Sequence, residues 1–194
     1  MKKLFPYFGG IMISAFGWLL HCSPVLSCTA AWSRIVGSVN LCAWELFKPF
    51  AIAYIFWILI ELSWLRPRLM HFVCAKLTGM LVLCISVLAL SMLLCSYMHY
   101  PVIRLVIAAA AISSAQLVSY LLYSSSFPVE ALRVPLILSL GCMVFMLLFL
   151  SFYPPHWGIF FDFHNGGYGH TIKDSTVSAA LSCSETAGHF LHII

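Results

Sequence analysis

Five long apolar runs alternate with short polar stretches along the 194-residue chain. The runs cover residues 4–21, 49–65, 71–95, 102–123 and 131–152. Each is close to the roughly 20 residues that a helix needs to cross the hydrocarbon core of a bilayer. They are continuously apolar and lack the alternation of strands that face lipid. The pattern therefore predicts an all-α membrane protein, in which residues 1–152 form a bundle of about five transmembrane helices.

The composition agrees with a lipid-facing exterior. Hydrophobic residues make up 62% of the chain and charged residues only 8%, whereas a soluble domain needs roughly a quarter of its residues charged. The formal net charge of +4 is small and scattered, so we expect the lipid bilayer and not a nucleic acid as the partner. The predicted localisation is the cell membrane, with several crossings. The residues indicate no particular cofactor.

The first run has a second interpretation. Lys2 and Lys3 precede it and "SPVLSC" follows it, which is also typical of a signal peptide, including a lipoprotein one. Leu26 is bulky for the position two before Cys28, and four more runs follow, so we favour an uncleaved first span. A disulfide in the next loop stays open if that loop is extracytoplasmic; its cysteines are Cys22, Cys28 and Cys42.

Basic residues and the number of crossings predict the orientation. An N-terminus inside puts five basic residues in the cytoplasm: Lys2, Lys3, Arg66, Arg68 and Arg133. The opposite side then receives four: Arg34, Lys48, Arg104 and Lys173. This bias favours a cytoplasmic N-terminus and an extracytoplasmic C-terminus. An odd number of crossings also brings the loop after the first span and the segment after the last to one side.

The stretch "SVNLCAWELFKPF" leads into the second span. Ser38 or Asn40 can cap a helix there, and Glu45 and Lys48 are three residues apart and can pair on one face. Pro49 clashes with the carbonyl of Glu45 in a regular helix, so we expect a bend or a break. The stretch is then a short interfacial helix that turns into the span. It is either a solvated helix start or one wall of a polar pocket.

Glu61 lies about one turn from the far end of the second span. A carboxylate at that depth needs a partner or must lose its charge. Arg66, Arg68 and Lys76 are the candidate partners, because a short turn brings the third span alongside. The alternatives are a structural ion pair and a carboxylate that couples to protons or ions.

The last apolar run ends in "FYPPHWGIFFDFHNGGYGH". Pro154 and Pro155 cannot continue a helix, and the aromatic side chains that follow are typical of a membrane interface. We expect residues 153–170 to form an interfacial segment with a glycine turn, and residues 171–194 to form a flexible tail. Aromatic anchoring does not explain His156 and Asp162 in one short segment.

Three reactive interpretations of that segment stay open beside a purely structural one. A metal ion has weak candidate ligands in His156, Asp162, His164 and His170. Alternatively, His156 acts as a general acid or base oriented by Asp162. In the third, the segment binds a small polar ligand or an ion at the mouth of a transport path.

The fourth span carries a ridge of small side chains at spacings of three and four residues, which lets another helix approach closely. Its members are Ala108, Ala111, Ala115 and Ser119. We expect packing within the bundle, and a helix of another chain is the alternative partner.

Two motifs together resemble a family of small bacterial integral membrane proteins classed as a domain of unknown function. They are "SVNLCAWELFKPF", followed by the glutamate-bearing span, and "FYPPHWGIFFDFHNGGYG". The resemblance covers roughly residues 4–169 and implies a multi-spanning architecture. It carries over to Asn40, Trp44, Glu45, Lys48, Pro154, Pro155, His156, Asp162, Tyr168 and Gly169. The chain departs from the pattern at Leu41, Cys42, Leu46 and Phe163.

We therefore predict a polar pocket on one face of the bundle. One wall consists of Asn40, Trp44, Glu45 and Lys48, and the other of His156, Asp162 and Tyr168. Such pairing lets buried polar groups satisfy one another. The expected function is that of a transporter-like or ligand- and ion-binding membrane component. The alternatives are a membrane enzyme or metal-binding protein built on His156 and Asp162, and an accessory subunit of a membrane complex.

Overall fold

The computed structural model describes residues 5–23, 36–38, 41–65, 69–125, 133–153, 155–162 and 167–168. Its long helices are α1 (Phe5–His21), α4 (Ala43–Leu65), α5 (Leu69–Leu93), α6 (Pro101–Ser124) and α7 (Arg133–Phe152). The predicted all-α fold is confirmed. The tail at residues 171–194 lies outside the described residues.

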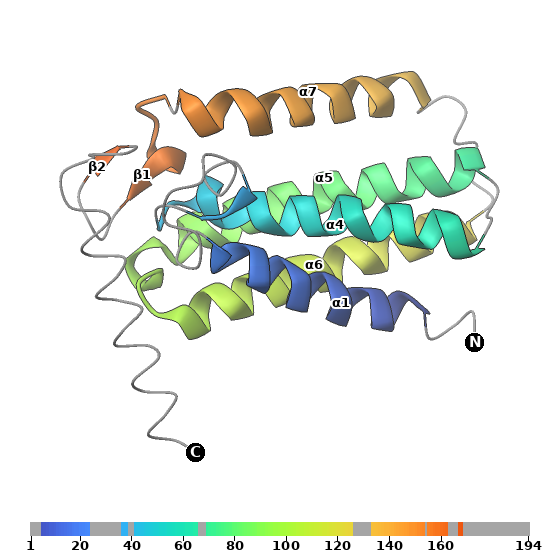
Figure 1. Ribbon diagram of the computed structural model, residues 1–194, viewed down its shortest axis with the longest axis horizontal. Helices are drawn as coiled ribbons and strands as arrows, with labels where there is room; N and C mark the ends of the chain where they lie inside the picture. The colour runs from blue at the N-terminus through green and yellow to red at the C-terminus, as the bar shows by residue number, and fades with distance from the viewer. Residues whose placement is uncertain are drawn as a thin grey trace, which may run out of the picture.

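The helices α1, α4, α5 and α6 pack side by side, and α7 lies along them against α5 (Figure 1). Successive helices run in opposite directions, so α1 ends where α4 begins and where α7 ends (Figure 1). At this end, η3 (Gly158–Phe160) contacts α4, and β1 (Phe161–Asp162) pairs antiparallel with β2 (Gly167–Tyr168). We call it the Asp162 end of the bundle. The opposite end, where α1 begins and α4 ends, is the Glu61 end (Figure 1).

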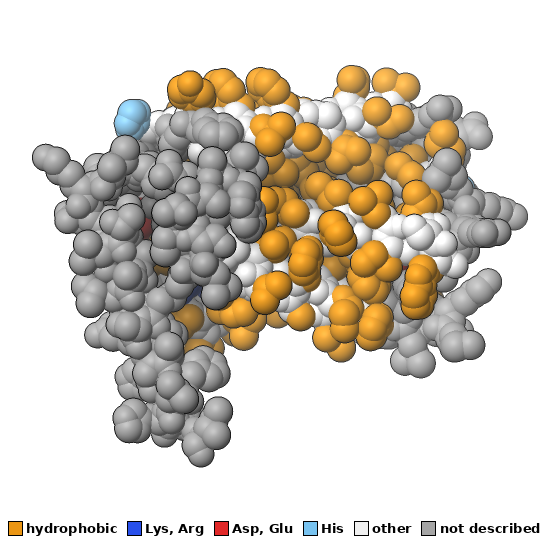
Figure 2. Space-filling view, viewed as in Figure 1, with side chains coloured by type: hydrophobic (Ala, Val, Ile, Leu, Met, Phe, Trp, Pro, Cys, Tyr) orange, Lys and Arg blue, Asp and Glu red, His pale blue; other side chains and the backbone are white. Residues whose placement is uncertain are grey.

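The bundle has the dimensions and the surface of a multi-pass membrane protein. Four helical stretches are long and apolar enough to cross a bilayer: Ala43–Trp64, Met70–Leu93, Pro101–Ser124 and Val134–Ser151. The helix α1 is shorter, with 17 residues and therefore a length of about 25 Å. Hydrophobic side chains cover much of the described surface (Figure 2). Of these four stretches, the one in α7 is the least buried, with 11% of its span inside the bundle against 56% for α4.

Close packing of α5 on α6 accounts for the small-residue ridge. Its four members, Ala108 to Ser119, are all buried in the bundle. A Cβ atom added to Gly79 of α5 would lie 2.8 Å from the carbonyl oxygen of Ala115. The ridge therefore meets a helix of its own chain, and these side chains are not exposed as a docking face for another protein.

The expected break at Pro49 is absent, which corrects one prediction. The helix α4 begins at Ala43, six residues earlier than the predicted span, and continues through Pro49 to Leu65. The Trp-Glu motif is thus the first turn of the membrane helix itself and not a separate interfacial helix. The reason lies in the carbonyl group that Pro49 leaves without a donor.

Candidate functional site

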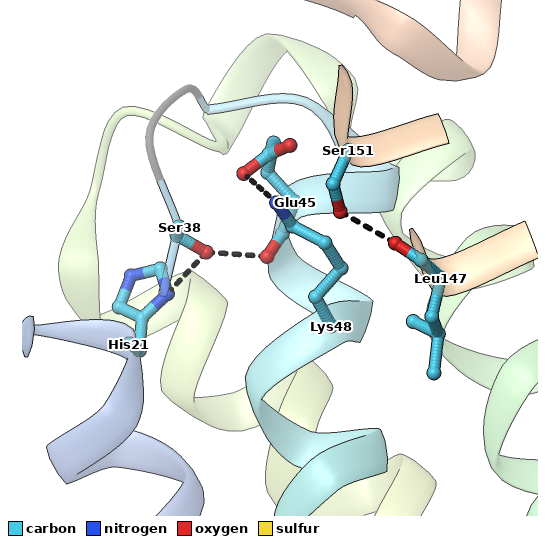
Figure 3. A network of polar contacts seen from close by, with 6 residues as sticks. All are labelled: His21, Ser38, Glu45, Lys48, Leu147 and Ser151. Carbon is cyan, nitrogen blue, oxygen red and sulfur yellow. Dashed lines mark hydrogen bonds and ion pairs between the residues drawn. The ribbon is translucent and has the colours of Figure 1, made fainter. Parts of the chain in front are cut away.

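The carbonyl of Glu45 receives a hydroxyl in place of an amide. In a regular helix the amide of residue 49 would donate to it, but proline has no N–H. The hydroxyl of Ser38 donates to this carbonyl instead (Figure 3). Either Ser38 or Asn40 was predicted to cap the helix, a role in which the side chain accepts from a backbone amide. Ser38 instead donates to a backbone carbonyl, and Asn40 lies outside the described residues. The substitution of one donor for another explains why α4 continues through Pro49.

The Ser38 hydroxyl is also the last donor in a series of hydrogen bonds that starts at Arg104 of α6. The guanidinium of Arg104 can only donate, and its Nη1 lies 3.0 Å from Nε2 of His21. Nε2 therefore accepts, so the proton of the neutral imidazole sits on Nδ1. Nδ1 lies 2.8 Å from the Ser38 oxygen and donates to it (Figure 3). The relay from Arg104 through His21 and Ser38 to Glu45 thus runs in one direction and joins α6, α1 and α4.

An ion pair lies in the first turns of α4. Nζ of Lys48 is 2.8 Å from Oε2 of Glu45, as the spacing of three residues predicted (Figure 3). Lys48 is fully buried and Glu45 is 8% exposed. The pair is therefore shielded from solvent, in contrast to the solvated helix start that was one of the two interpretations.

The segment after α7 covers this end of α4. The carboxylate of Asp162, which is 2% exposed, accepts a hydrogen bond from the amide of Leu41 at 3.3 Å. The ring of Phe160 packs on that of Trp44 with 5.7 Å between centroids. A carboxylate before the first turn of a helix is stabilised by the helix dipole and by the amides that lack intrahelical partners. Two stretches about 120 residues apart therefore meet at one polar site.

The pKa of the Cys42 thiol depends on the charged groups of this site. Burial, and to a smaller extent the carboxylates of Glu45 and Asp162, raise the pKa of its thiol to about 12, although Lys48 and a hydrogen bond with the backbone of Glu45 act in the opposite direction. Two carboxylates and one ammonium group thus act on the thiol. The excess of one negative charge is offset by about half a charge at the N-terminus of α4. Cys22 and Cys42 both carry reduced thiols, and Cys28 lies outside the described residues.

The other predicted site residues are only partly accounted for. His156 is exposed, unlike the buried Asp162. The backbone of Tyr168 lies in β2, paired with Phe161, but its side chain is outside the described residues. Asn40, His164 and His170 are also outside them. Within the described part of the chain, no three His, Cys, Asp or Glu side chains gather as metal ligands, so the metal hypothesis stays a prediction.

A second polar cluster occupies the Glu61 end. Nζ of Lys76 lies 2.5 Å from Oε2 of Glu61, so one of the three predicted partners is the observed one. The same ammonium donates to Oε1 of Gln116 at 3.2 Å. All three side chains are buried. Nε2 of Gln116 has no hydrogen-bond partner among the described residues.

His21, Arg104 and Gln116 were not singled out from the sequence. His21 ends the first apolar run and Arg104 begins the fourth, so helices that alternate in direction bring the two residues to one end of the bundle. Pro49 four residues after Glu45 also signals a carbonyl that needs another donor. Gln116 carries a weaker signal, since a lone amide in an apolar span needs a polar neighbour.

Comparison with known proteins finds no family model, no curated protein and no solved structure that matches this chain. The arrangement of these polar groups is therefore the basis for any functional assignment.

Proposed function

We propose that the protein is a transporter-like membrane component that binds a small polar solute at the Asp162 end of the bundle. The observation that carries the proposal is the contact between the buried Asp162 and the Leu41 amide. Through it, the segment after α7 lies over the turn that holds Glu45 and Lys48. Buried polar groups from two distant stretches, converging at one end of a membrane bundle, are typical of a solute site.

The chemistry of the site favours a cationic solute with a hydrogen-bond acceptor. The excess of carboxylates over ammonium groups around Cys42 attracts a positive charge. Trp44 is 7% exposed, and its indole N–H has no hydrogen-bond partner among the described residues. Such a donor gains most from a ligand that supplies an oxygen atom. Small amines with a hydroxyl or carboxylate group meet both demands.

Thermal unfolding of the purified protein in nanodiscs tests the proposal. Ethanolamine should raise the unfolding temperature more than propylamine, which has the same charge but no oxygen, with sodium chloride as the ionic-strength reference. The variant Trp44→Phe should lose the difference between the two amines. Asp162→Asn should respond to neither, whereas Ser113→Ala, a change on the exposed face of α6, should behave as the wild type. Equal unfolding temperatures in all three salts for the folded wild type would contradict the proposal.

A further inference from the structure

The ammonium group of Lys76 occupies a position that has the ligands of a cation site. A carboxylate oxygen of Glu61 lies at 2.5 Å and the amide oxygen of Gln116 at 3.2 Å. The ring centroids of Tyr54 and Phe72 lie 6.0 and 5.7 Å from the nitrogen. Oxygen atoms and aromatic faces are the groups that replace water around a monovalent cation. Lys76 thus acts as a tethered cation inside the bundle.

Electrical neutrality restricts what else can enter this position. Glu61 is 3% exposed and Lys76 is 7% exposed, and together they carry no net charge. A second positive charge beside them, or the loss of the first, leaves an uncompensated charge in a medium of low dielectric constant. A cation can therefore bind to Glu61 only when Lys76 gives up its proton.

We propose that the Glu61–Lys76–Gln116 cluster exchanges a monovalent alkali cation for the proton of Lys76. In this exchange Lys76 releases one proton to water and becomes a neutral amine. The cation takes its place at the oxygens of Glu61 and Gln116. One positive charge leaves as one arrives, so the net charge of the cluster does not change. The inference does not rest on the solute site at the Asp162 end.

The amide nitrogen of Gln116 supports the exchange independently. Gln116 is only 5% exposed, yet Nε2 has no hydrogen-bond partner among the described residues. A neutral amine at Lys76 has a lone pair that needs a donor, and this nitrogen belongs to the amide that already contacts it. The deprotonated state thereby satisfies a donor that the ion-paired state leaves unsatisfied.

The position of the cluster allows exchange with water from one side. Glu61 is four residues from the end of α4 at Leu65, a distance of about 6 Å along the helix. Lys76 is seven residues from the start of α5 at Leu69, about 10 Å. Glu61 and Tyr54, both on α4, are titratable groups of another helix that face Lys76. The helix α7 contributes the apolar Leu136 to this region.

Proton release on cation addition tests the exchange directly. The full chain in nanodiscs is placed in weakly buffered solution with a pH-sensitive dye, and sodium or potassium chloride is added against choline chloride of equal ionic strength. The wild type and the control Ser113→Ala should release about one proton per chain with an alkali cation and none with choline. Absence of release from folded wild type would overturn the proposal.

Substitutions of the pair separate exchange from a purely structural role. Lys76→Met leaves Glu61 alone, so it should unfold at a lower temperature in choline and be rescued by sodium or potassium, without proton release. The double variant Glu61→Gln, Lys76→Met has no buried charge at this position and should fold, with neither rescue nor release. Equal rescue of Lys76→Met by choline, or undiminished proton release from the double variant, would show that the cluster is not the site.

Discussion

The relay through Ser38 leads to a quantitative prediction about Pro49. Replacing Ser38 with alanine removes the donor of the Glu45 carbonyl and the acceptor of His21 Nδ1–H. Each buried polar group left without a partner destabilises a protein by about 1–3 kcal/mol. Allowing for partial relaxation, we expect Ser38→Ala to lower the free energy of unfolding by about 2–4 kcal/mol. His21 cannot avoid the loss by changing tautomer, because Arg104 donates to its other nitrogen.

A second substitution isolates the backbone contribution. Pro49→Ala restores an amide to position 49, and this amide can donate to the Glu45 carbonyl in the regular helical pattern. In the Pro49→Ala background, Ser38→Ala then leaves only the N–H of His21 without a hydrogen-bond partner. It should lower the free energy of unfolding by about 1–2 kcal/mol. The two substitutions should therefore couple by about 1–2 kcal/mol, as expected for residues that share one partner.

Equilibrium unfolding in mixed micelles, with increasing fractions of a denaturing detergent, measures all four proteins of the cycle. The loss of packing around the buried proline ring appears equally in both backgrounds and cancels. Additive effects of the two substitutions would refute the reasoning, since they would mean that Ser38 does not replace the missing amide. A helix signal in Ser38→Ala that ends before residue 49, seen by hydrogen exchange, would support it independently.

Three further predictions concern other positions. The Cys42 pKa rises from 9.0 to about 12 on folding, so the unfolded chain loses this proton at a lower pH than the folded one. Between pH 9 and 12 the free energy of unfolding of the wild type should therefore fall by about 1.4 kcal/mol per pH unit relative to that of Cys42→Ser. Parallel pH curves for the two proteins would contradict this. Asp162→Ala should lower the free energy of unfolding by about 1.5–3 kcal/mol and Asp162→Asn by roughly half as much, because asparagine keeps an oxygen for the Leu41 amide; equal losses would argue against that hydrogen bond. Gly79→Ala should destabilise the protein by about 1–3 kcal/mol, because the added methyl group meets Tyr54 and Ala115. Gly141→Ala has open space around it and should stabilise the protein by up to about 1 kcal/mol. The reverse order in a thermal unfolding assay would contradict the close packing of α5 on α6.

The architecture could be predicted because lipid imposes it. An apolar run long enough to cross a bilayer must form a helix that satisfies its own backbone groups, so hydropathy alone indicates the helices. The antiparallel order of the five long helices in the described part of the chain then brings the start of α4 and the end of α7 together, as Asp162 and Leu41 show. Pairing of Glu45 with Lys48 followed from their spacing. The depth of Glu61 indicated that it needs a partner, and Lys76 is the observed one of three candidates.

Tertiary contacts account for what the sequence could not reveal. The clash expected at Pro49 is a local rule, and a hydroxyl from outside the helix overrides its consequence. The roles of His21 and Arg104 depend on how α1 and α6 rotate about their axes, and apolar runs without a strong periodic face do not define that rotation. The contact between Gln116 and Lys76, which are 40 residues apart, could not be predicted for the same reason, because it depends on how α5 and α6 are rotated.

The polar groups of this bundle differ in whether the fold needs them. Ser38 and Asp162 satisfy backbone groups at the start of α4 that would otherwise lack partners, so the helix itself requires them. Glu61 and Lys76 instead satisfy each other and the amide oxygen of Gln116. A buried ion pair replaced by apolar side chains of similar volume often leaves stability unchanged or raises it by about 1–4 kcal/mol. Stability alone therefore gives no reason to keep Glu61 about 20 Å along α4 from Lys48, in the most buried of the four apolar spans, with Lys76 of α5 beside it. The proposed exchange at the Glu61 end does give a reason, because it needs a carboxylate to balance the charge of a cation and an ammonium group to release a proton in return.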